Sequence, residues 1–207
     1  MTPAEFARAF DVSRETCGRL EAYVALLVRW NARINLVSPS TLETVWIRHI
    51  ADSVQLFDLA RPNARRWIDL GSGAGLPGLP IAAIAAERAP NLRVTLVEGD
   101  VRKAAFLATA SREMGLDVNV ESRRIESMAP QAYDVISARA LAPLAQLCAL
   151  AHRFSGPGTI YLFLKGEKLD SELTATVAGW HIQAERIVSR TDPKATVLRI
   201  LELNPRS

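Results

Sequence analysis

The sequence predicts an α/β fold, in which helices cover a doubly wound, mostly parallel sheet of about seven strands behind a helical N-terminal segment. Two observations predict this fold. From residue 67 onward, short apolar runs typical of buried strands alternate with segments of helix length. Before residue 62, apolar side chains recur at helical spacing instead. We therefore divide the chain into an N-terminal helical extension, residues 1–62, and an α/β domain, residues 63–207.

The composition is that of a globular protein. Of the 207 residues, 49% are hydrophobic and 23% are charged, which excludes a disordered chain. The 25 basic and 22 acidic residues give a net charge of +3, which favours a nucleic-acid partner only weakly. Every apolar stretch is far shorter than the roughly 20 residues that a membrane span requires. We expect a cytoplasmic protein that has no membrane partner.

The two cysteines, Cys17 and Cys148, are too few and too isolated for a disulfide framework or a zinc site. We expect both thiols to be reduced and packed. No bound metal is predicted.

Two helices are predicted in the N-terminal segment. The first begins after Ser13 and ends near residues 31–35, because its apolar side chains keep helical spacing throughout. The second begins at a capping box formed by Ser40 and Glu43, and it ends at Pro62.

Five short apolar runs follow and read as strands, and residues 181–188 and 196–203 read as two more. The connection between the last two is too short for a parallel crossover, so these strands must pair in antiparallel fashion. The first helix of this part begins near Gly78. The predicted strands occupy residues 67–70, 93–98, 118–122, 134–138, 159–164, 181–188 and 196–203.

A glycine-rich loop joins the first strand to that helix. Residues 69–78 read DLGSGAGLPG, and glycines at such a turn allow positive φ angles and let a ligand approach the backbone. The letters GAGLPG fit the dinucleotide pattern GxGxxG, whereas DLGSGAG fits the loops that bind S-adenosylmethionine. The cofactor-binding candidates in this loop are Asp69, Gly71, Gly73 and Gly75.

Two details favour S-adenosylmethionine over NAD, and a third fits both cofactors. The carboxylate of Asp69 would repel a pyrophosphate but suits a sulfonium cofactor. Pro77 removes an N–H that a pyrophosphate would use at the helix N-terminus. Glu98 ends the second strand, where a carboxylate can accept both ribose hydroxyls of either cofactor. An NAD-dependent oxidoreductase remains the alternative enzyme.

Several further segments, together with the loop, carry a family resemblance. They are WNARINL at 30–36, HIADS at 49–53, LVE at 96–98, RIE at 124–126, SARA at 137–140 and LKG at 164–166. In order and spacing the chain resembles the RsmG (GidB) family, the 16S ribosomal RNA guanine-N7 methyltransferases.

The resemblance implies a class I, Rossmann-like methyltransferase fold with an antiparallel last strand. It also implies methyl transfer from S-adenosylmethionine to N7 of a guanine in the decoding-region loop of 16S rRNA. The partner would then be 16S rRNA or the small ribosomal subunit, with no stable protein partner. Leu76 stands where many relatives carry Phe. Carried over by position, the residues that line the cofactor site are Gly71, Leu76, Ile125, Glu126 and Arg139.

The expected chemistry needs no general base, because guanine N7 carries a lone pair and no proton. A covalent mechanism is disfavoured, since Cys148 lies among apolar residues within a predicted helix. Positioning residues are expected instead. Arg139, at the end of the fourth strand, is the first candidate, and Lys165, at the end of the fifth, is the second.

Other polar and aromatic residues have less specific interpretations. Arg48 and His49 lie opposite the apolar stripe of the second helix, where they face RNA or serve the structure. Trp30 and Trp46 lie on or beside apolar stripes and are expected to pack rather than stack on bases. A non-catalytic RNA-binding protein that kept the glycine loop is the alternative that is not an enzyme.

Overall fold

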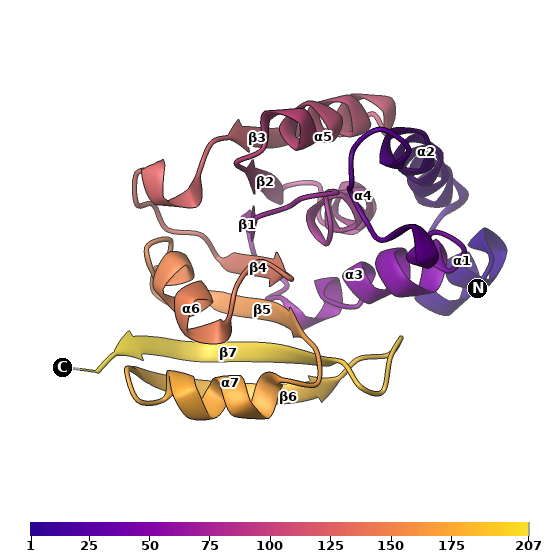
Figure 1. Cartoon of the computed structure of the whole chain (residues 1–207). Helices are drawn as coiled ribbons and strands as arrows, with labels where there is room; N and C mark the ends of the chain where they lie inside the picture. Colours follow the sequence, from indigo (N-terminus) through magenta and orange to yellow (C-terminus); the bar gives the residue numbers. More distant parts are fainter. Residues whose placement is uncertain (207) are drawn as a thin grey trace.

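The computed structural model describes residues 1–206 and contains a seven-stranded sheet in the order β3-β2-β1-β4-β5-β7-β6 (Figure 1). The first five strands are parallel, and β7 runs antiparallel to both of its neighbours, β5 and β6. The predicted α/β class and the antiparallel final pair are confirmed. The strands are β1 (Arg66–Leu70), β2 (Arg93–Glu98), β3 (Val118–Ser122), β4 (Val135–Arg139), β5 (Ile160–Lys165), β6 (Trp180–Val188) and β7 (Thr196–Pro205).

The helices between the strands cover both faces of the sheet, as their core residues show. The buried residues of α4 and α5 belong to one hydrophobic cluster, and those of α6 and α7 belong to a second. Within residues 1–206 no helix has the length and apolarity needed to cross a membrane. The helices are α4 (Gly78–Arg88), α5 (Val101–Glu113), η4 (Ile125–Ser127), α6 (Leu144–His152) and α7 (Leu169–Thr176).

Alternate residues of each central strand point into opposite clusters. In β1, Trp67 faces the cluster of α4 and α5, whereas Ile68 faces the cluster of α6 and α7. This alternation is what a sheet covered on both faces requires. Cys148 is fully buried in the second cluster and Cys17 is buried in the first, and both are free thiols, as predicted.

The N-terminal segment is more broken than the sequence predicts. The long helix after Ser13 is confirmed, since its hydroxyl accepts from the Thr16 amide at 3.1 Å. A first short helix, α1, was not predicted. The elements are α1 (Pro3–Phe10), α2 (Arg14–Asn31), the 3₁₀ turn η1 (Pro39–Thr41), the π-helical turn η2 (Trp46–Ala51), α3 (Asp52–Val54) and the 3₁₀ turn η3 (Phe57–Leu59).

The predicted capping box at Ser40 and Glu43 is wrong. The Ser40 hydroxyl bonds to the hydroxyl of Ser38 at 2.9 Å, because Pro39 starts a 3₁₀ turn before any α-helix can form. The chain's capping box instead lies at the N-terminus, where Thr2 and Glu5 cap α1. The second predicted helix is therefore a series of short turns, and it ends before Pro62.

The N-terminal helices share a core with the sheet. Leu27 of α2 and Ile50 of η2 belong to the same cluster as Phe106 of α5. Trp46 contacts Phe6 at 5.4 Å and Trp30 contacts Phe106 at 5.6 Å between ring centroids, so both tryptophans pack as predicted. The division of the chain at residue 62 stays a prediction.

Candidate functional site

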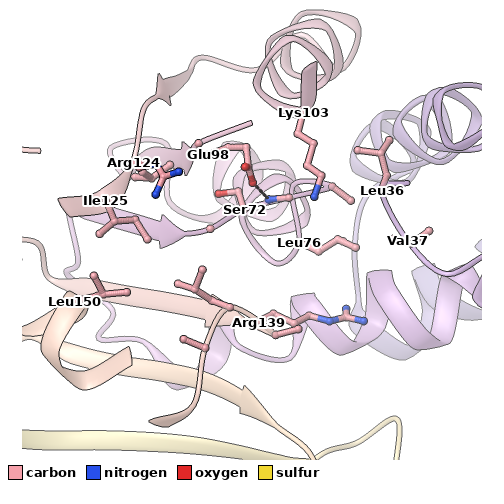
Figure 2. A pocket seen from close by; sticks show the side chains of 18 of the residues that line it. Leu36, Val37, Ser72, Leu76, Glu98, Lys103, Arg124, Ile125, Arg139 and Leu150 are labelled. Atoms are coloured by element: carbon pink, nitrogen blue, oxygen red, sulfur yellow. Dashed lines mark hydrogen bonds between the residues drawn. The ribbon is translucent and has the colours of Figure 1, made fainter. Parts of the chain in front are cut away.

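A cavity of about 630 Å³ lies at the carboxyl ends of β1, β2 and β4 (Figure 2). This is the edge of a doubly wound sheet where ligands bind. The glycine loop forms one wall, and the connection between α2 and η2 forms another. Its lining residues come from segments 36–41, 71–76, 97–103, 124–126 and 139–150, together with His49.

The glycines of the loop serve different purposes. Gly71, Gly73 and Gly75 all have positive φ angles, +65°, +56° and +86°, which explains why glycine stands there. A Cβ atom at Gly73 would have only the Gly71 carbonyl oxygen nearby, at 3.8 Å, so Gly73 keeps the cavity open. A Cβ atom at Gly75 would collide with Leu79. Gly75 therefore serves the packing of α4, and it is not among the residues that line the cavity.

Asp69 does not line the cavity, contrary to the expected contact with the cofactor. Its side chain is fully buried behind the loop, where it accepts hydrogen bonds from the Ser137 hydroxyl at 2.8 Å and the Gly78 amide at 3.3 Å. Burial raises the pKa of Asp69 to about 7. Asp69 thus ties β1 to β4 and to the start of α4.

The N-terminus of α4 offers little to a pyrophosphate. The Gly78 N–H donates to Asp69, the Leu79 N–H donates to the Gly75 carbonyl at 2.7 Å, and Pro77 has no N–H. A dinucleotide needs free N–H groups at this place. Asp69 and Pro77 therefore disfavour NAD, as the sequence predicts. Asp69 does so by occupying the N-terminus of α4 and not by repelling the pyrophosphate directly.

Glu98 lines the cavity at the end of β2. Its carboxylate accepts from the Gly73 amide and from the Asp100 amide, each at 2.8 Å (Figure 2 shows the first). A carboxylate has about four lone-pair sites, so two remain for ligand hydroxyls. The geometry fits the ribose contact that the sequence predicts. Leu76, Ile125 and Glu126 also lie in the cavity wall.

Arg139 stands at the end of β4 between two cavities. It lines the large cavity and a smaller one of about 360 Å³, and Ala140 lines both as well. Its Nη2 lies 2.8 Å from Nδ1 of His49, and its Nη1 lies 3.5 Å from a carboxylate oxygen of Asp52. Nη1 is buried and makes no hydrogen bond to any of residues 1–206. An unsatisfied guanidinium N–H beside a cavity is suited to a ligand carboxylate or a base edge.

His49 is the site residue that sequence reasoning placed least well. Its side chain is buried against the large cavity, and its Nε2 lies 2.8 Å from the Thr41 hydroxyl. Burial, together with the charges of Arg139 and Arg48, lowers the pKa of His49 to about 4. The spacing of three residues between His49 and Asp52 was the available signal, since it places both on one side of a helical turn.

Lys165 lies in the wall of the smaller cavity and is already paired. Its ammonium forms an ion pair with Glu172 and donates to the Ala142 carbonyl at 3.3 Å. Phosphate contact by Lys165 stays a prediction, and it would require a change of partner. Within the part of the chain that the structure describes, no group of three or more potential metal ligands comes together.

Comparison with known proteins decides the family. A family model described as rRNA small subunit methyltransferase G matches residues 16–196. The chain belongs to this family. Two relatives named ribosomal RNA small subunit methyltransferase G show this similarity. The one from a Jannaschia species is 53% identical to this chain, and the one from Methylobacterium strain 4-46 is 50% identical. The first alignment covers 91% of this chain and 89% of the relative, and the second covers 99% and 98%.

Solved structures support the fold of this methyltransferase G family member. A putative O-methyltransferase from Klebsiella pneumoniae has a TM-score of 0.58 at 17% identity and covers 89% of this chain and 90% of its own. A SAM-dependent methyltransferase from Aquifex aeolicus has a TM-score of 0.55 at 14% identity, with 80% and 100% covered. The predicted Rossmann-like methyltransferase class is confirmed, and the family membership agrees with S-adenosylmethionine as the methyl donor.

Proposed function

We propose that this chain transfers a methyl group from S-adenosylmethionine to N7 of a guanine in the decoding-region loop of 16S rRNA. Membership of the rRNA small subunit methyltransferase G family supports the reaction class and the RNA substrate. One observation carries the assignment of the site. Arg139 lines two adjoining cavities, and its buried Nη1 makes no hydrogen bond in the described chain, although it lies 3.5 Å from the Asp52 carboxylate.

The larger cavity is the proposed cofactor site. Glu98 would accept the ribose hydroxyls, while Nη1 of Arg139, which makes no hydrogen bond in the described chain, would donate to the cofactor carboxylate. Gly71, Gly73 and Leu76 would contact the ligand from the loop. Ile125 and Glu126 would close the cavity from the side of η4. When bound, S-adenosylmethionine supplies an electrophilic methyl group.

The smaller cavity is the proposed entrance for the guanine. It adjoins the cofactor cavity at Arg139 and Ala140. Arg48 and Lys165 also line it, each in an ion pair, with Asp192 and Glu172 respectively. Ala140 has a φ of +50°, a strained conformation for alanine that is typical of functional sites. The protein would hold N7 in line with the methyl group and exclude water.

No residue needs to remove a proton in this reaction, because guanine N7 attacks with its lone pair. Asp69 lies behind the loop, and the Nδ1 of His49 is engaged by Arg139. We therefore assign positioning roles to Arg139 and Lys165 and no acid–base pair.

Methyl transfer can be measured directly. The protein is incubated with radiolabelled S-adenosylmethionine and, in turn, with naked 16S rRNA, the isolated decoding-region domain, and the assembled small subunit. N7-methylguanine is then located by chemical strand cleavage. Incorporation at a guanine of the decoding-region loop supports the proposal. RNA binding without incorporation would favour the non-catalytic alternative.

Replacing Arg139 tests the positioning role. Arg139→Ala should lower the single-turnover rate by on the order of 100-fold, because a misplacement of about 1 Å can have that effect. Cofactor affinity should fall by a smaller factor. Arg139→Lys should restore little, since a point charge does not reproduce a planar fork. Arg93→Ala is the matched control, because Arg93 is exposed at the opposite end of β2. A normal rate in Arg139→Ala would move the role to Lys165.

A further inference from the structure

A directed chain of hydrogen bonds runs from Arg139 through His49 to the segment 38–41. A guanidinium can only donate, so Nδ1 of His49 must accept from Arg139. In the neutral ring the proton is then on Nε2, which donates to the Thr41 hydroxyl. That hydroxyl donates its own proton to the Ser38 carbonyl at 2.7 Å. Each donor in the chain has one acceptor, so the direction is fixed.

The surroundings of His49 favour this neutral form. His49 is 4% exposed, and a charged imidazolium would present a second donor to Arg139 and repel it. Asp52 faces Arg139 at 3.5 Å, and Arg48 is paired with Asp192 at 2.7 Å. The low pKa of His49 agrees with a ring that stays neutral at physiological pH.

Both ends of this series of hydrogen bonds, Arg139 and the segment 38–41, reach the proposed cofactor cavity. Residues 36–41, which we call the cover segment, contribute Leu36, Val37, Ser38 and Thr41 to its wall. In Figure 2, Leu36, Val37, Leu76 and the guanidinium of Arg139 lie on one side of the cavity. The other end of the cover segment is held by Asn31, whose side-chain Oδ1 accepts from the backbone amides of Leu36 and Val37, each at 2.9 Å.

We propose that His49 is a positioning residue that couples the cover segment to the guanidinium of Arg139. His49 removes no proton and need not touch a ligand. It holds Nη2 of Arg139, so that Nη1, which makes no hydrogen bond in the described chain, can donate to a ligand, and it fixes the cover segment at Thr41. The effect of His49 on methylation rests on the proposed function, whereas its effect on Arg139 does not.

The first test uses the protein without cofactor or RNA. Nitrogen-15 NMR of the imidazole groups should show His49 as the neutral Nε2–H tautomer throughout pH 6 to 8. In Arg139→Ala the preference for that tautomer should weaken, and the pKa of His49 should rise because a neighbouring positive charge is gone. An Nδ1–H tautomer, or an ordinary titration near pH 6.5, would overturn the proposal.

The second test separates the two hydrogen bonds of the ring. His49→Asn keeps an acceptor near the place of Nδ1 and loses Thr41, whereas His49→Gln keeps a donor near Nε2 and loses Arg139. Cofactor affinity should fall more in the Asn variant, and the single-turnover methylation rate should fall more in the Gln variant. We expect losses on the order of 10- to 100-fold. His181→Asn, at an exposed position of β6, should change neither.

Thr41→Val provides a milder variant that leaves His49 and Arg139 in place. It should weaken cofactor binding as His49→Asn does, with little change in the temperature of unfolding. Equal losses of affinity and rate in the Asn and Gln variants, in proportion to lost stability, would show that His49 serves only the core. If the wild type methylates no RNA, the proposed function fails, while the NMR result still decides the coupling.

Discussion

The carboxylate of Asp69 is buried behind the glycine loop and does not line the cavity. Its place near the end of β1 predicted contact with the cofactor, because a carboxylate beside the glycine loop suits a sulfonium cofactor. The structure instead uses both of its oxygens to accept from Ser137 and Gly78. Ser137 and Gly78 lie 68 and nine residues away in the sequence, so no local sequence pattern predicts these contacts.

The raised pKa of Asp69 makes a testable contribution to stability. Folding raises this pKa from 3.8 to about 7, so the folded state binds the proton more tightly than the unfolded state does. The contribution is complete below pH 3.8 and is lost as the pH rises through 7. The free energy of unfolding of the wild type, minus that of Asp69→Asn, should therefore fall by about 1 to 4 kcal/mol over this range. Urea unfolding at a series of pH values measures it. A difference that is constant with pH would contradict the shift.

Gly73 is the loop position where a side chain should harm binding most selectively. The open space beside Gly73 lies in the proposed cofactor cavity, so the branched side chain of Gly73→Val should abolish S-adenosylmethionine binding. The positive φ adds strain of about 1 kcal/mol or more. Isothermal titration measures affinity, and circular dichroism checks the fold. Wild-type affinity in a folded Gly73→Val protein would remove the loop from the site.

Sequence reasoning located the cavity wall better than the contacts behind it. Gly71, Gly73, Leu76, Glu98 and Arg139 all lie in the wall, and their binding roles stay predictions. They could be found because strand ends and a glycine turn bring them to one edge. His49 was placed less well, since its role depends on Arg139, which lies 90 residues away and meets it only in the folded chain.

Among the elements, the strands were predicted to within a few residues, and the N-terminal turns were not. The strands β1, β2, β4 and β5 are five or six residues long and almost entirely buried, so their apolar pattern is visible in the sequence. The π-helical turn η2 depends on tertiary packing, because its backbone departs from the spacing on which helical periodicity rests. The capping box predicted at Ser40 and Glu43 is therefore wrong, although both residue types fit the capping-box pattern.

The cover segment depends on Asn31 at its first end. Asn31→Ala removes the acceptor for two amides, which should destabilise the protein by about 1 to 3 kcal/mol. Cofactor affinity should fall as well, because the segment forms part of the cavity wall. Hydrogen exchange at Leu36 and Val37 should quicken. Asn119→Ala, on the exposed edge strand β3, is the control and should leave exchange there unchanged. Unaltered protection of both amides in Asn31→Ala would contradict this role.

On the scale of the whole molecule, the N-terminal helices complete the core of the sheet. Leu20, Leu27 and Ile50 are fully buried in the cluster that α4 and α5 also form. The Tyr23 hydroxyl donates to the Ala74 carbonyl at 2.7 Å, which ties α2 to the glycine loop. Removal of the helices would expose an apolar face of considerable size.

A chain that begins at residue 63 should therefore not fold on its own. We expect it to aggregate or to show no cooperative thermal transition, whereas the full chain unfolds cooperatively. Circular dichroism and size-exclusion chromatography measure both properties. A soluble, cooperative fragment would show that residues 63–207 form an independent domain. The sequence predicted the two parts from their periodicity, but it could not show that they share one core.

The full order of the strands in the sheet could not be predicted from the sequence either. Alternating strands and helices predict a doubly wound sheet, yet the insertion of β7 between β5 and β6 follows from how the last hairpin packs. Because β7 ends the parallel run, the edge that carries the site ends at β5, beside Lys165.

Both natural thiols are withdrawn from solvent, and this makes the protein convenient for spectroscopy. Cys148 is fully buried, and burial raises the pKa of its thiol to about 12, while that of Cys17 is raised in the same way. Alkylating reagents attack thiolates, so neither residue should react quickly while the chain is folded. A cysteine introduced at Val188, which is 65% exposed, would then take a fluorescent or spin label selectively, with the natural sequence otherwise intact.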